Sequence, residues 1–542
     1  MSIWFTRSTV SATETWKTVQ GDRVMPYTET GAARRGKGWL WIVIPLVVIG
    51  FLVFAQLFNF ASQFQSSGLV LIALALVGIP ALLLLPLALR EGLAYARSFV
   101  PTLKWWHVLW ALTVVSAMVF RRRTVADITS DPLDAWAVYR IAVDMVVGFT
   151  LLARLTLRRT QWLGSMFRGT VGALSVYGLV CLASTAWSVY PSWTIFKSFE
   201  YLVDIALLAA VLETLDSVDQ YRNFFNWTWA IYAVLLLGVW KDVPLWPREA
   251  LYEGVENGAF LGIRLSGVLP AWSANDVGTF SSILAVLCLA RLFPASATER
   301  FRKPWYTLLL LISLVSLVLS QTRIAVFGFL LAGLIILLYA KRGKLGAVVT
   351  LIVAPIVALI TMGGVIWSFI ARGQTTAEMG TLSSRTEWWG LAWQTFMQQP
   401  FTGFGAFAAG RFAVLAKAGF GETGTLHSDY LEVLVGTGFW GMIPLLVALI
   451  GTWWLLWRFL RDASDPQERQ LAVEAFAILA LLTLRSLFNN MMTVHPPLPF
   501  LAIVGYAEFL RRRRKAFMAY EPRRLRDLVT AQGDTAPQLF PD

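Results

Sequence analysis

One of the three histidines in the sequence, His427, stands where a general base would be useful. It lies in the polar stretch 421–430, directly before a long apolar run that begins at Leu431. A neutral imidazole at such a boundary meets both water and a hydrocarbon surface, and it can accept a proton at physiological pH. His107 lies among tryptophans and is interpreted as an interfacial anchor, whereas His495 precedes two prolines and is interpreted as a capping or packing residue. The candidate catalytic residue is therefore His427.

Several arginines have the chemistry to bind phosphate oxygens near this histidine. They lie in the polar connections between apolar runs or close to the end of a run, and they are Arg264, Arg323, Arg385 and Arg485. A guanidinium group can contact two phosphate oxygens at once, so a cluster of such groups could hold a lipid diphosphate. A structural interpretation stays open, in which Arg385 pairs with a nearby glutamate and Arg323 extends its side chain to the membrane surface.

Composition indicates which elements must position these residues. Of the 542 residues, 57% are hydrophobic and only 15% are charged, which excludes an ordinary soluble enzyme. Apolar runs of ~20 residues are long enough to cross a bilayer. The sequence therefore predicts an all-α, polytopic membrane helix bundle with about 12–14 spans. The predicted spans are 39–61, 68–89, 104–120, 136–156, 169–187, 193–212, 224–243, 275–291, 305–320, 324–340, 345–369, 436–458, 470–488 and 497–510.

The distribution of basic residues predicts the orientation. The formal charge of +13 could suggest nucleic acid, but Lys and Arg gather in short segments between the apolar runs, as they do at the cytoplasmic side of membrane proteins. Both termini are then expected inside. Two long connections, 244–274 and 370–429, fall outside, and connections of that length are usually functional or disordered. The second contains too many aromatic residues for simple disorder. The run Arg121-Arg122-Arg123 also falls outside, which conflicts with the rule unless a neighbouring span does not cross.

Several short motifs resemble the O-antigen ligases and related polysaccharide polymerases of bacterial envelopes. The ligase pattern H-[NSQ]-x9-G-x2-[GTY] is matched by His427, Ser428, Gly438 and Gly441. Further resemblances are the segment Ser184 to Pro191, Arg264-Leu265-Ser266-Gly267, Ser320-Gln321-Thr322-Arg323, and Arg385 followed by Pro400 and Gly403-Phe404-Gly405. Together they cover roughly residues 170–510. The glycines would allow close approach of a lipid or a neighbouring helix, or would simply permit helix packing.

The resemblance implies a metal-independent, inverting glycosyltransferase with the general architecture of the enzymes that use lipid-linked sugars. The donor would be a glycan on undecaprenyl diphosphate, and the acceptor another glycan or a lipid A core sugar. Membrane lipids and other polysaccharide assembly proteins are further expected partners. The site would face the periplasm of a bacterial inner membrane, with His427 as the base and the four arginines around the diphosphate. The choice between ligase and polymerase stays open.

The same evidence predicts a division of the chain into four parts. Residues 1–38 form a cytoplasmic arm, 39–165 supply additional spans, 166–510 form the ligase-like domain with its periplasmic loop 370–429, and 511–542 form a basic cytoplasmic tail. The sequence shows no phosphate-binding glycine loop and no set of residues with metal-ligand spacing, so no cofactor and no metal are expected. The two cysteines, Cys181 and Cys288, lie in apolar runs and are interpreted as packing residues.

Functions from other classes stay open. A secondary transporter or flippase for a lipid-linked or soluble glycan would suit the charged residues within predicted spans, among them Arg140, Asp144, Lys197, Glu200 and Asp204. Arg140 and Asp144, four residues apart on a helix, could instead form only a structural pair. An inactive scaffold for a polysaccharide export complex is a third alternative. The transporter interpretation gives the long outer connection 370–429 no role.

Overall fold

The computed structural model describes most of the chain between residues 83 and 514. The described residues are 83–94, 97, 99–118, 124–157, 160–252, 262–295, 303–340, 367, 369–371, 385–421, 424–463, 465–493 and 498–514. All of them belong to one structural unit, Val53–Asp542. The expected N-terminal arm, the span 39–61, most of the spans 68–89 and 345–369, the Arg121 to Arg123 run and His495 lie outside the described residues.

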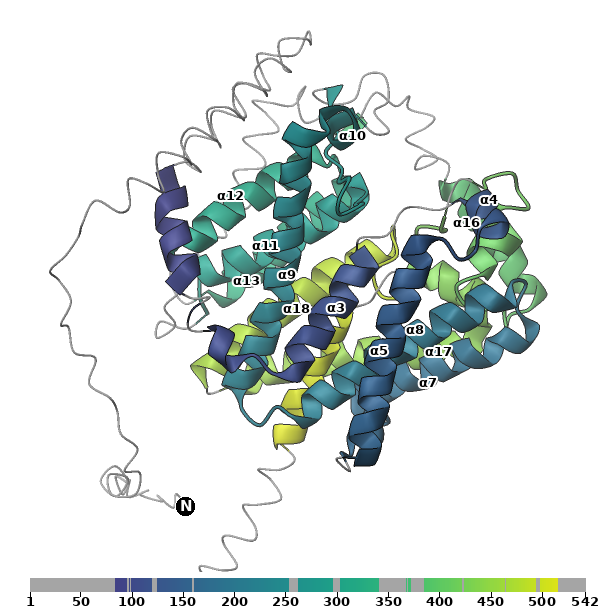
Figure 1. Ribbon diagram of the computed structural model, residues 1–542, viewed down its shortest axis with the longest axis horizontal. Coiled ribbons are helices and arrows are strands. Elements are labelled where there is room, and N and C mark those ends of the chain that lie inside the picture. Colours follow the sequence, from purple (N-terminus) through teal and green to yellow (C-terminus); the bar gives the residue numbers. More distant parts are fainter. Residues whose placement is uncertain are drawn as a thin grey trace, which may run out of the picture. The chain divides into compact units, whose positions relative to one another are not determined.

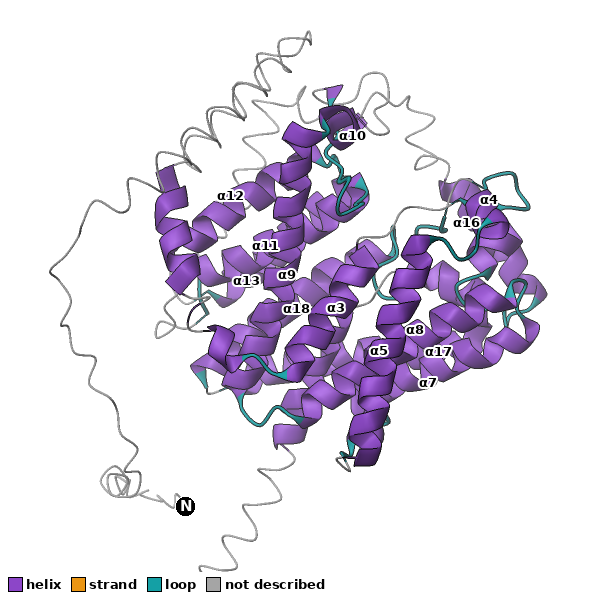
Figure 2. Ribbon diagram, in the orientation of Figure 1, coloured by secondary structure: helices purple, strands orange, loops and turns teal. Residues whose placement is uncertain are grey.

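Helices joined by loops make up the described part of the chain, which contains no strand (Figures 1 and 2). Long helices dominate, because apolar segments can satisfy their backbone hydrogen bonds internally in a helix. The elements are η2 (Val100–Thr102), α3 (Trp105–Met118), α4 (Val125–Ser130), α5 (Ala135–Leu157), α6 (Trp162–Met166), α7 (Gly169–Ala183), η3 (Ser184–Trp187), α8 (Pro191–Glu213), α9 (Val218–Leu245), α10 (Pro247–Tyr252), α11 (Ala274–Leu292), α12 (Lys303–Leu319), α13 (Arg323–Tyr339), α16 (Arg385–Gln398), the π-helical η5 (Ala409–Leu415), α17 (Asp429–Asp462) and α18 (Pro466–Ser486). Residues 83–94 and 498–514 are also helical.

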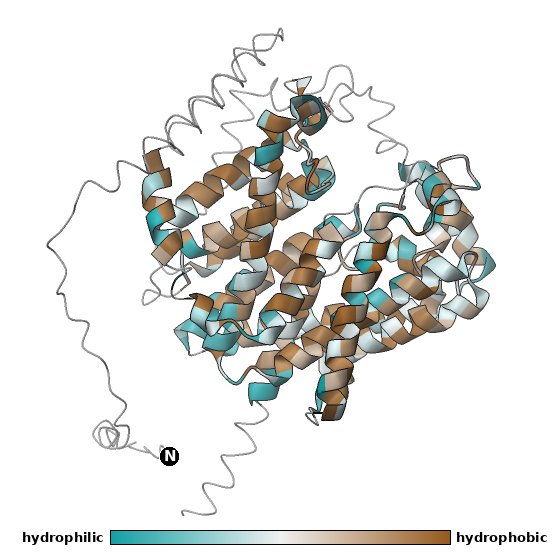
Figure 3. Cartoon of the chain, viewed as in Figure 1, coloured by the Kyte–Doolittle hydropathy of each residue, from teal (hydrophilic) through white to brown (hydrophobic). Residues whose placement is uncertain are grey.

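The length and composition of these helices are those of membrane spans. Within the described residues, five helical segments are long and apolar enough to cross a membrane: Ala135–Leu157, Gly169–Trp187, Val218–Leu245, Ala274–Leu292 and Asp429–Asp462. Shorter apolar helices cover Trp105–Met118, Pro304–Leu319 and Arg323–Tyr339. Hydrophobic residues run along most of these helices in Figure 3. The all-helical membrane fold is thus confirmed, while the number of predicted spans stays a prediction.

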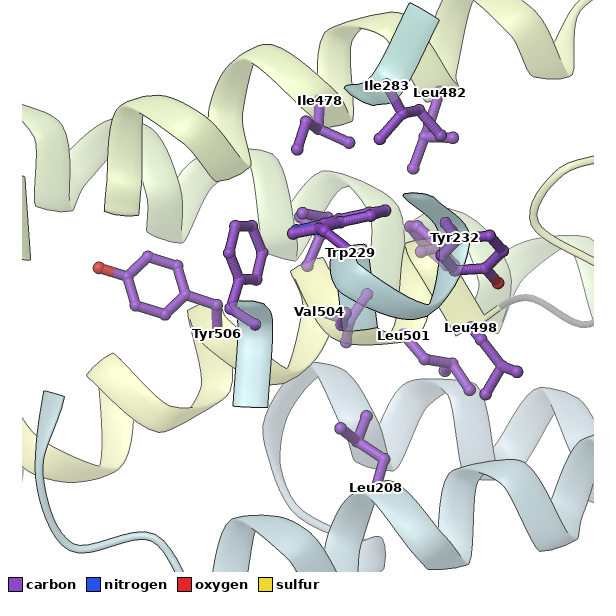
Figure 4. Packing of buried hydrophobic residues seen from close by; sticks show 14 of the residues in the cluster. Leu208, Trp229, Tyr232, Ile283, Ile478, Leu482, Leu498, Leu501, Val504 and Tyr506 are labelled. Atoms are coloured by element: carbon purple, nitrogen blue, oxygen red, sulfur yellow. The ribbon is translucent and has the colours of Figure 1, made fainter. Parts of the chain in front are cut away.

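Aromatic and branched side chains from several helices meet in one core. Trp229 of α9 is 2% exposed, and it lies between Ile478 of α18 and Val504 of the helix 498–514 (Figure 4). Ile283 of α11 packs into the same cluster. Lipid tails are as apolar as these side chains, so close van der Waals packing rather than exclusion of water holds such helices together. The same core includes residues of α13 and α18, the helices whose ends carry Arg323 and Arg485.

The glycines of the ligase-like pattern join α17 to the segment 400–405. The helix is interrupted at Gly438, where φ is +60° and ψ is −152°. The amide groups released by this break are used: Phe439 N donates to Pro400 O at 2.9 Å and Trp440 N donates to Phe401 O at 3.2 Å. A Cβ atom at position 438 would lie 2.4 Å from the Phe401 backbone. Of the two interpretations of this glycine, the structure therefore supports close packing of the chain against itself.

The first prediction follows from this break. Gly438→Ala should lower the melting temperature of the purified protein, because a backbone with φ near +60° and ψ near −150° is essentially limited to glycine and costs another residue about 1–3 kcal/mol, and because the new methyl group meets backbone atoms. Gly390→Ala is the matched control, since a Cβ atom at this position of α16 has no neighbour within 4 Å and alanine favours a helix by about 0.5–1 kcal/mol. Thermal unfolding in detergent checks both variants. A Gly438→Ala protein that melts at or above the wild-type temperature would contradict the assigned strain.

Candidate active site

His427 lies just before the first turn of α17 in a strained backbone conformation. Its φ is +54°, a value that is uncommon outside glycine. The half-buried ring approaches Asn489, with 3.4 Å between His427 Nδ1 and Asn489 Oδ1, and it stacks against the Trp388 ring at a centroid distance of 6.0 Å. Residues in rare backbone conformations persist where the surrounding structure holds them, and they are frequent at active sites. The neighbours of His427 show how it is held.

Hydrogen bonds to both backbone groups of Leu426 fix the residue before His427. Leu426 N donates to the Glu432 carboxylate at 2.6 Å, and Leu426 O accepts from Trp389 Nε1 at 2.9 Å. Two residues earlier, Gly424 O accepts from Arg411 Nε at 2.9 Å. Glu432 and Leu426 are both buried. The loop that carries His427 is therefore attached to α16, η5 and α17, and the imidazole cannot easily leave its place.

The buried carboxylate of Asp429 binds the segment that carries Asn489, the hydrogen-bond partner of His427. Its Oδ2 accepts from Met491 N at 2.7 Å and Met492 N at 2.9 Å, and its Oδ1 accepts from the Thr493 amide at 3.1 Å and the Thr493 hydroxyl at 2.5 Å. Hydrogen bonds to a charged acceptor are roughly twice as strong as neutral ones. They fix residues 491–493, which directly follow Asn489 and Asn490. Asp429 is thus a positioning residue for the His427 environment.

Arg485 reaches from α18 to the first turns of α11. Its Nη2 donates to Asn275 O at 3.2 Å and to the Thr279 hydroxyl at 2.5 Å. The side chain is buried, and the positive charge of Arg385 and the negative charge of Asp276 both act on it. Within the described residues Arg485 makes no salt bridge, so a positive charge stands close to the start of α11.

Arg264 and Arg323 belong to segments that pack against each other at the same helix ends. Leu265 N donates to Leu319 O at 2.9 Å, and Gln321 donates from its side-chain amide to Ile263 O. Next to Arg323, the Thr322 hydroxyl donates to Ala274 O at 3.0 Å. These contacts bring the backbones at both arginines to the start of α11, where Arg485 also binds. The backbone segments of Arg264 and Arg323 and the side chain of Arg485 therefore meet at the start of α11.

Arg385 begins α16 and connects this region to the His427 site. Its Nη1 donates to Phe488 O at 2.9 Å, one residue before Asn489. Arg385 thus has a backbone carbonyl as a partner. The sequence predicts a glutamate or a diphosphate as its partner and does not predict this contact. The Arg385 side chain thus contacts Phe488, the residue directly before Asn489.

The other two histidines have different surroundings. His107 was expected to be an interfacial anchor, but it is buried, with 2% exposure. Its Nδ1 accepts from the Lys104 amide at 2.8 Å, and its ring stacks on Trp106. His107 is therefore not an interfacial anchor. The first amides of a helix lack partners within the helix, and the His107 ring accepts a hydrogen bond from one such amide, that of Lys104. His495 lies outside the described residues, so its predicted role stays a prediction.

Sequence reasoning missed the residues that support His427. These are Asp429, Glu432, Trp389 and Asn489. Two acidic residues in the first turn of an otherwise apolar helix are the signal that could have identified the first pair, since a buried carboxylate requires hydrogen-bond donors. The described ranges contain no group of three His, Cys, Asp or Glu side chains that could hold a metal ion.

Comparison with known families agrees with the motifs. Residues 308–446 match the family model of the O-antigen ligases. The matched segment contains Arg323, Arg385, His427 and the glycine break of α17. No curated protein matches the chain. The resemblance predicted from the sequence is thereby confirmed for this segment: the chain is an integral membrane protein that carries an O-antigen ligase domain over residues 308–446.

The second prediction concerns the Asp429 carboxylate. Asp429→Ala should increase deuterium uptake at the amides of Met491, Met492 and Thr493, because these donors lose their acceptor. A hydrogen bond to a charged group is worth about 1.5–3 kcal/mol, which corresponds to roughly a 10- to 150-fold loss of protection. Asp462→Ala is the control, since its partners Arg461 and Arg514 lie elsewhere. Exchange followed by mass spectrometry checks both. Unchanged uptake in Asp429→Ala would show that other contacts hold the segment.

Proposed function

We propose that the protein transfers a glycan from undecaprenyl diphosphate to a hydroxyl group of an acceptor glycan or of a lipid A core sugar, as a ligase or a polymerase. The family match to the O-antigen ligases supports a role in surface polysaccharide biosynthesis. The observation that carries the finer proposal is the His427 loop, which is anchored through Glu432 and Trp389 while its ring faces the segment 489–493. A histidine held in this way suits proton transfer at a defined point.

In the proposed reaction His427 acts as a general base. It takes the proton of the acceptor hydroxyl while the acceptor oxygen forms a bond to the anomeric carbon of the donor. The bond between that carbon and the diphosphate oxygen breaks, and the lipid diphosphate leaves with its electron pair. Direct attack from the opposite face inverts the anomeric configuration. Asn489 is placed to bond with His427 Nδ1, which would select the tautomer whose other nitrogen can accept a proton.

The departing diphosphate is assigned to the arginines. Its negative charge grows as the bond to the sugar breaks, and preorganised guanidinium groups stabilise such charge more than they stabilise the ground state. The segments of Arg264, Arg323 and Arg485 meet at the start of α11, and Arg385 links them to Phe488, next to Asn489. No step of the proposed reaction calls for a metal ion, because the arginines supply the positive charge.

The transporter alternative finds less support in the buried charges. Glu200 of α8 binds both Arg140 of α5 and Lys197 of its own helix, the latter at 2.8 Å. Arg140 therefore pairs with Glu200 across two helices. Paired charges of this kind join helices and need no transported ion to explain them. We place the site on the periplasmic side and both termini in the cytoplasm, in accordance with the distribution of basic residues.

The third prediction tests the general base. His427→Ala should lower glycan transfer by about 10²–10⁴-fold, because removal of a general base typically has that effect. The variant should insert and melt like the wild type, since the ring is only half buried. Transfer from a lipid diphosphate donor to an acceptor by the purified protein is the measurement, with His495→Ala as the control. Full activity of His427→Ala, or an equal loss in His495→Ala, would remove the special role of His427.

The fourth prediction tests the diphosphate contact by a substitution that preserves charge. Arg264→Lys should reduce transfer roughly 10- to 150-fold, because lysine lacks the planar fork and the loss of one charge-assisted contact costs about 1.5–3 kcal/mol. Arg264→Ala should reduce transfer further. Arg461→Lys, at an exposed site near the end of α17, is the control and should retain the wild-type rate. If Arg264→Lys also retains that rate, the contact belongs instead to Arg323 or Arg385.

A further inference from the structure

A cavity of about 200 Å³ lies beside the loop that carries His427. Its walls come from α4, α5 and α8, from η5 and from Gly424 and Thr425 of that loop. Aromatic side chains line much of it, including Trp136, Trp193 and Phe196. Trp136 and Leu133, both exposed, stand where the cavity meets the surroundings. The proposed reaction does not use this cavity.

Hydrogen bonds between two distant segments make one side of the cavity rigid. Trp193 Nε1 donates to Phe407 O at 3.1 Å, and the Thr194 hydroxyl donates to Ala406 O at 2.9 Å. Tyr190 stacks on Phe412 with ring centroids 4.5 Å apart. Arg411 lies over the Trp193 ring and also bonds to Gly424 O. The wall of the cavity and the His427 loop are therefore parts of one connected structure.

The charges around the cavity balance one another. Three basic residues, Arg140, Lys197 and Arg411, and one acidic residue, Asp134, line it, and each basic residue also has a glutamate acting on it. Glu200 binds the first two, and Glu432 acts electrostatically on Arg411. A diphosphate would require an excess of positive charge, which this arrangement lacks. A neutral ligand rich in hydroxyl groups fits better, because each hydroxyl can both donate to a carboxylate and accept from a cationic group.

The size and position of the cavity suit one end of a larger molecule. Pockets that enclose a whole small ligand usually measure about 300–1,000 Å³, so a cavity of about 200 Å³ holds less than such a ligand. It adjoins the His427 loop through Gly424 and Thr425, whereas the arginine-bearing segments reach that histidine through Phe488 and Asn489. In a direct displacement the acceptor oxygen and the leaving diphosphate lie on opposite faces of the anomeric carbon, so the acceptor needs a binding place apart from the arginines. None of the four candidate arginines lines the cavity.

We propose that this cavity binds a neutral sugar unit of the acceptor glycan, with the aromatic side chains packing against the sugar and with Arg140, Lys197 and Arg411 bonding to its hydroxyl groups. The inference rests on the proposed glycan transfer. Part of the cavity is built from residues 128–141, which precede the segment that matches the O-antigen ligases. The additional N-terminal helices would then supply acceptor recognition to a transfer site built by the later part of the chain.

Acceptor kinetics test the proposal with two variants and one control. Trp136→Ala removes an aromatic wall, and Ser192→Trp obstructs the cavity without removing a contact. Either variant should raise the KM for the acceptor about tenfold, as expected for the loss of one aromatic contact, and leave the KM for the lipid diphosphate donor unchanged. Phe149→Ala is the control, because Phe149 is an exposed aromatic residue of the same helix that does not line the cavity. The acceptor probe is an oligosaccharide released from the surface polysaccharide of the cells that make the protein.

Direct binding separates the failure of this proposal from the failure of the proposed function. Saturation-transfer NMR with the same oligosaccharide and no donor should show binding to the wild type and to Phe149→Ala, and weaker binding to Trp136→Ala and Ser192→Trp. If the wild type binds in this pattern but transfers nothing, the proposed function fails and the sugar site stands. If the variants bind and use the acceptor like the wild type, or if they raise the donor KM instead, the acceptor site is overturned. Absence of binding by the wild type in both assays also overturns it.

Discussion

Two buried carboxyl groups in the first turn of α17 hold the candidate site together. Asp429 binds the segment 491–493 and Glu432 binds the backbone of Leu426, so His427 and Asn489 are fixed from opposite sides by the same helix start. Buried carboxylates are stable only when they are hydrogen-bonded, and here the donors are backbone amides and one threonine hydroxyl of the two segments that meet at the histidine. If either segment moved away, a buried carboxylate would lose its hydrogen-bond donors, so the free energy of burying Asp429 and Glu432 favours the observed geometry of the site.

The break in α17 has a related consequence. A continuous helix would leave no free amides to bind the segment 400–405, whereas the break at Gly438 supplies those of Phe439 and Trp440. That segment leads into η5, which carries Arg411, and Arg411 bonds to the loop before His427. One helix therefore positions the histidine at its start and the wall of the adjacent cavity at its interruption. This arrangement explains why the pattern combines His427 with Gly438: the histidine lies before the start of α17, and the glycine allows the break in the same helix.

Much of the fold follows from the sequence, because apolar length and the positions of charged residues determine where membrane helices begin and end. The predicted runs 136–156, 193–212 and 275–291 correspond to α5, α8 and α11 within a few residues. The helix α16 was not predicted, since the outer connection has no long apolar run. The pairing of Arg140 with Glu200 could not be predicted either, because it depends on how two helices pack. The same holds for Asn489, which is 62 residues from His427.

Direct displacement of the lipid diphosphate by the acceptor hydroxyl is the central claim, and the stereochemistry of a single turnover tests it most directly. Purified protein would be mixed with a lipid diphosphate donor of known anomeric configuration, and the new linkage would be assigned by NMR while the released lipid diphosphate is quantified. We predict one equivalent of lipid diphosphate for each glycan transferred and an inverted linkage. A retained configuration, or a glycan attached covalently to the protein before the acceptor is added, would contradict direct displacement.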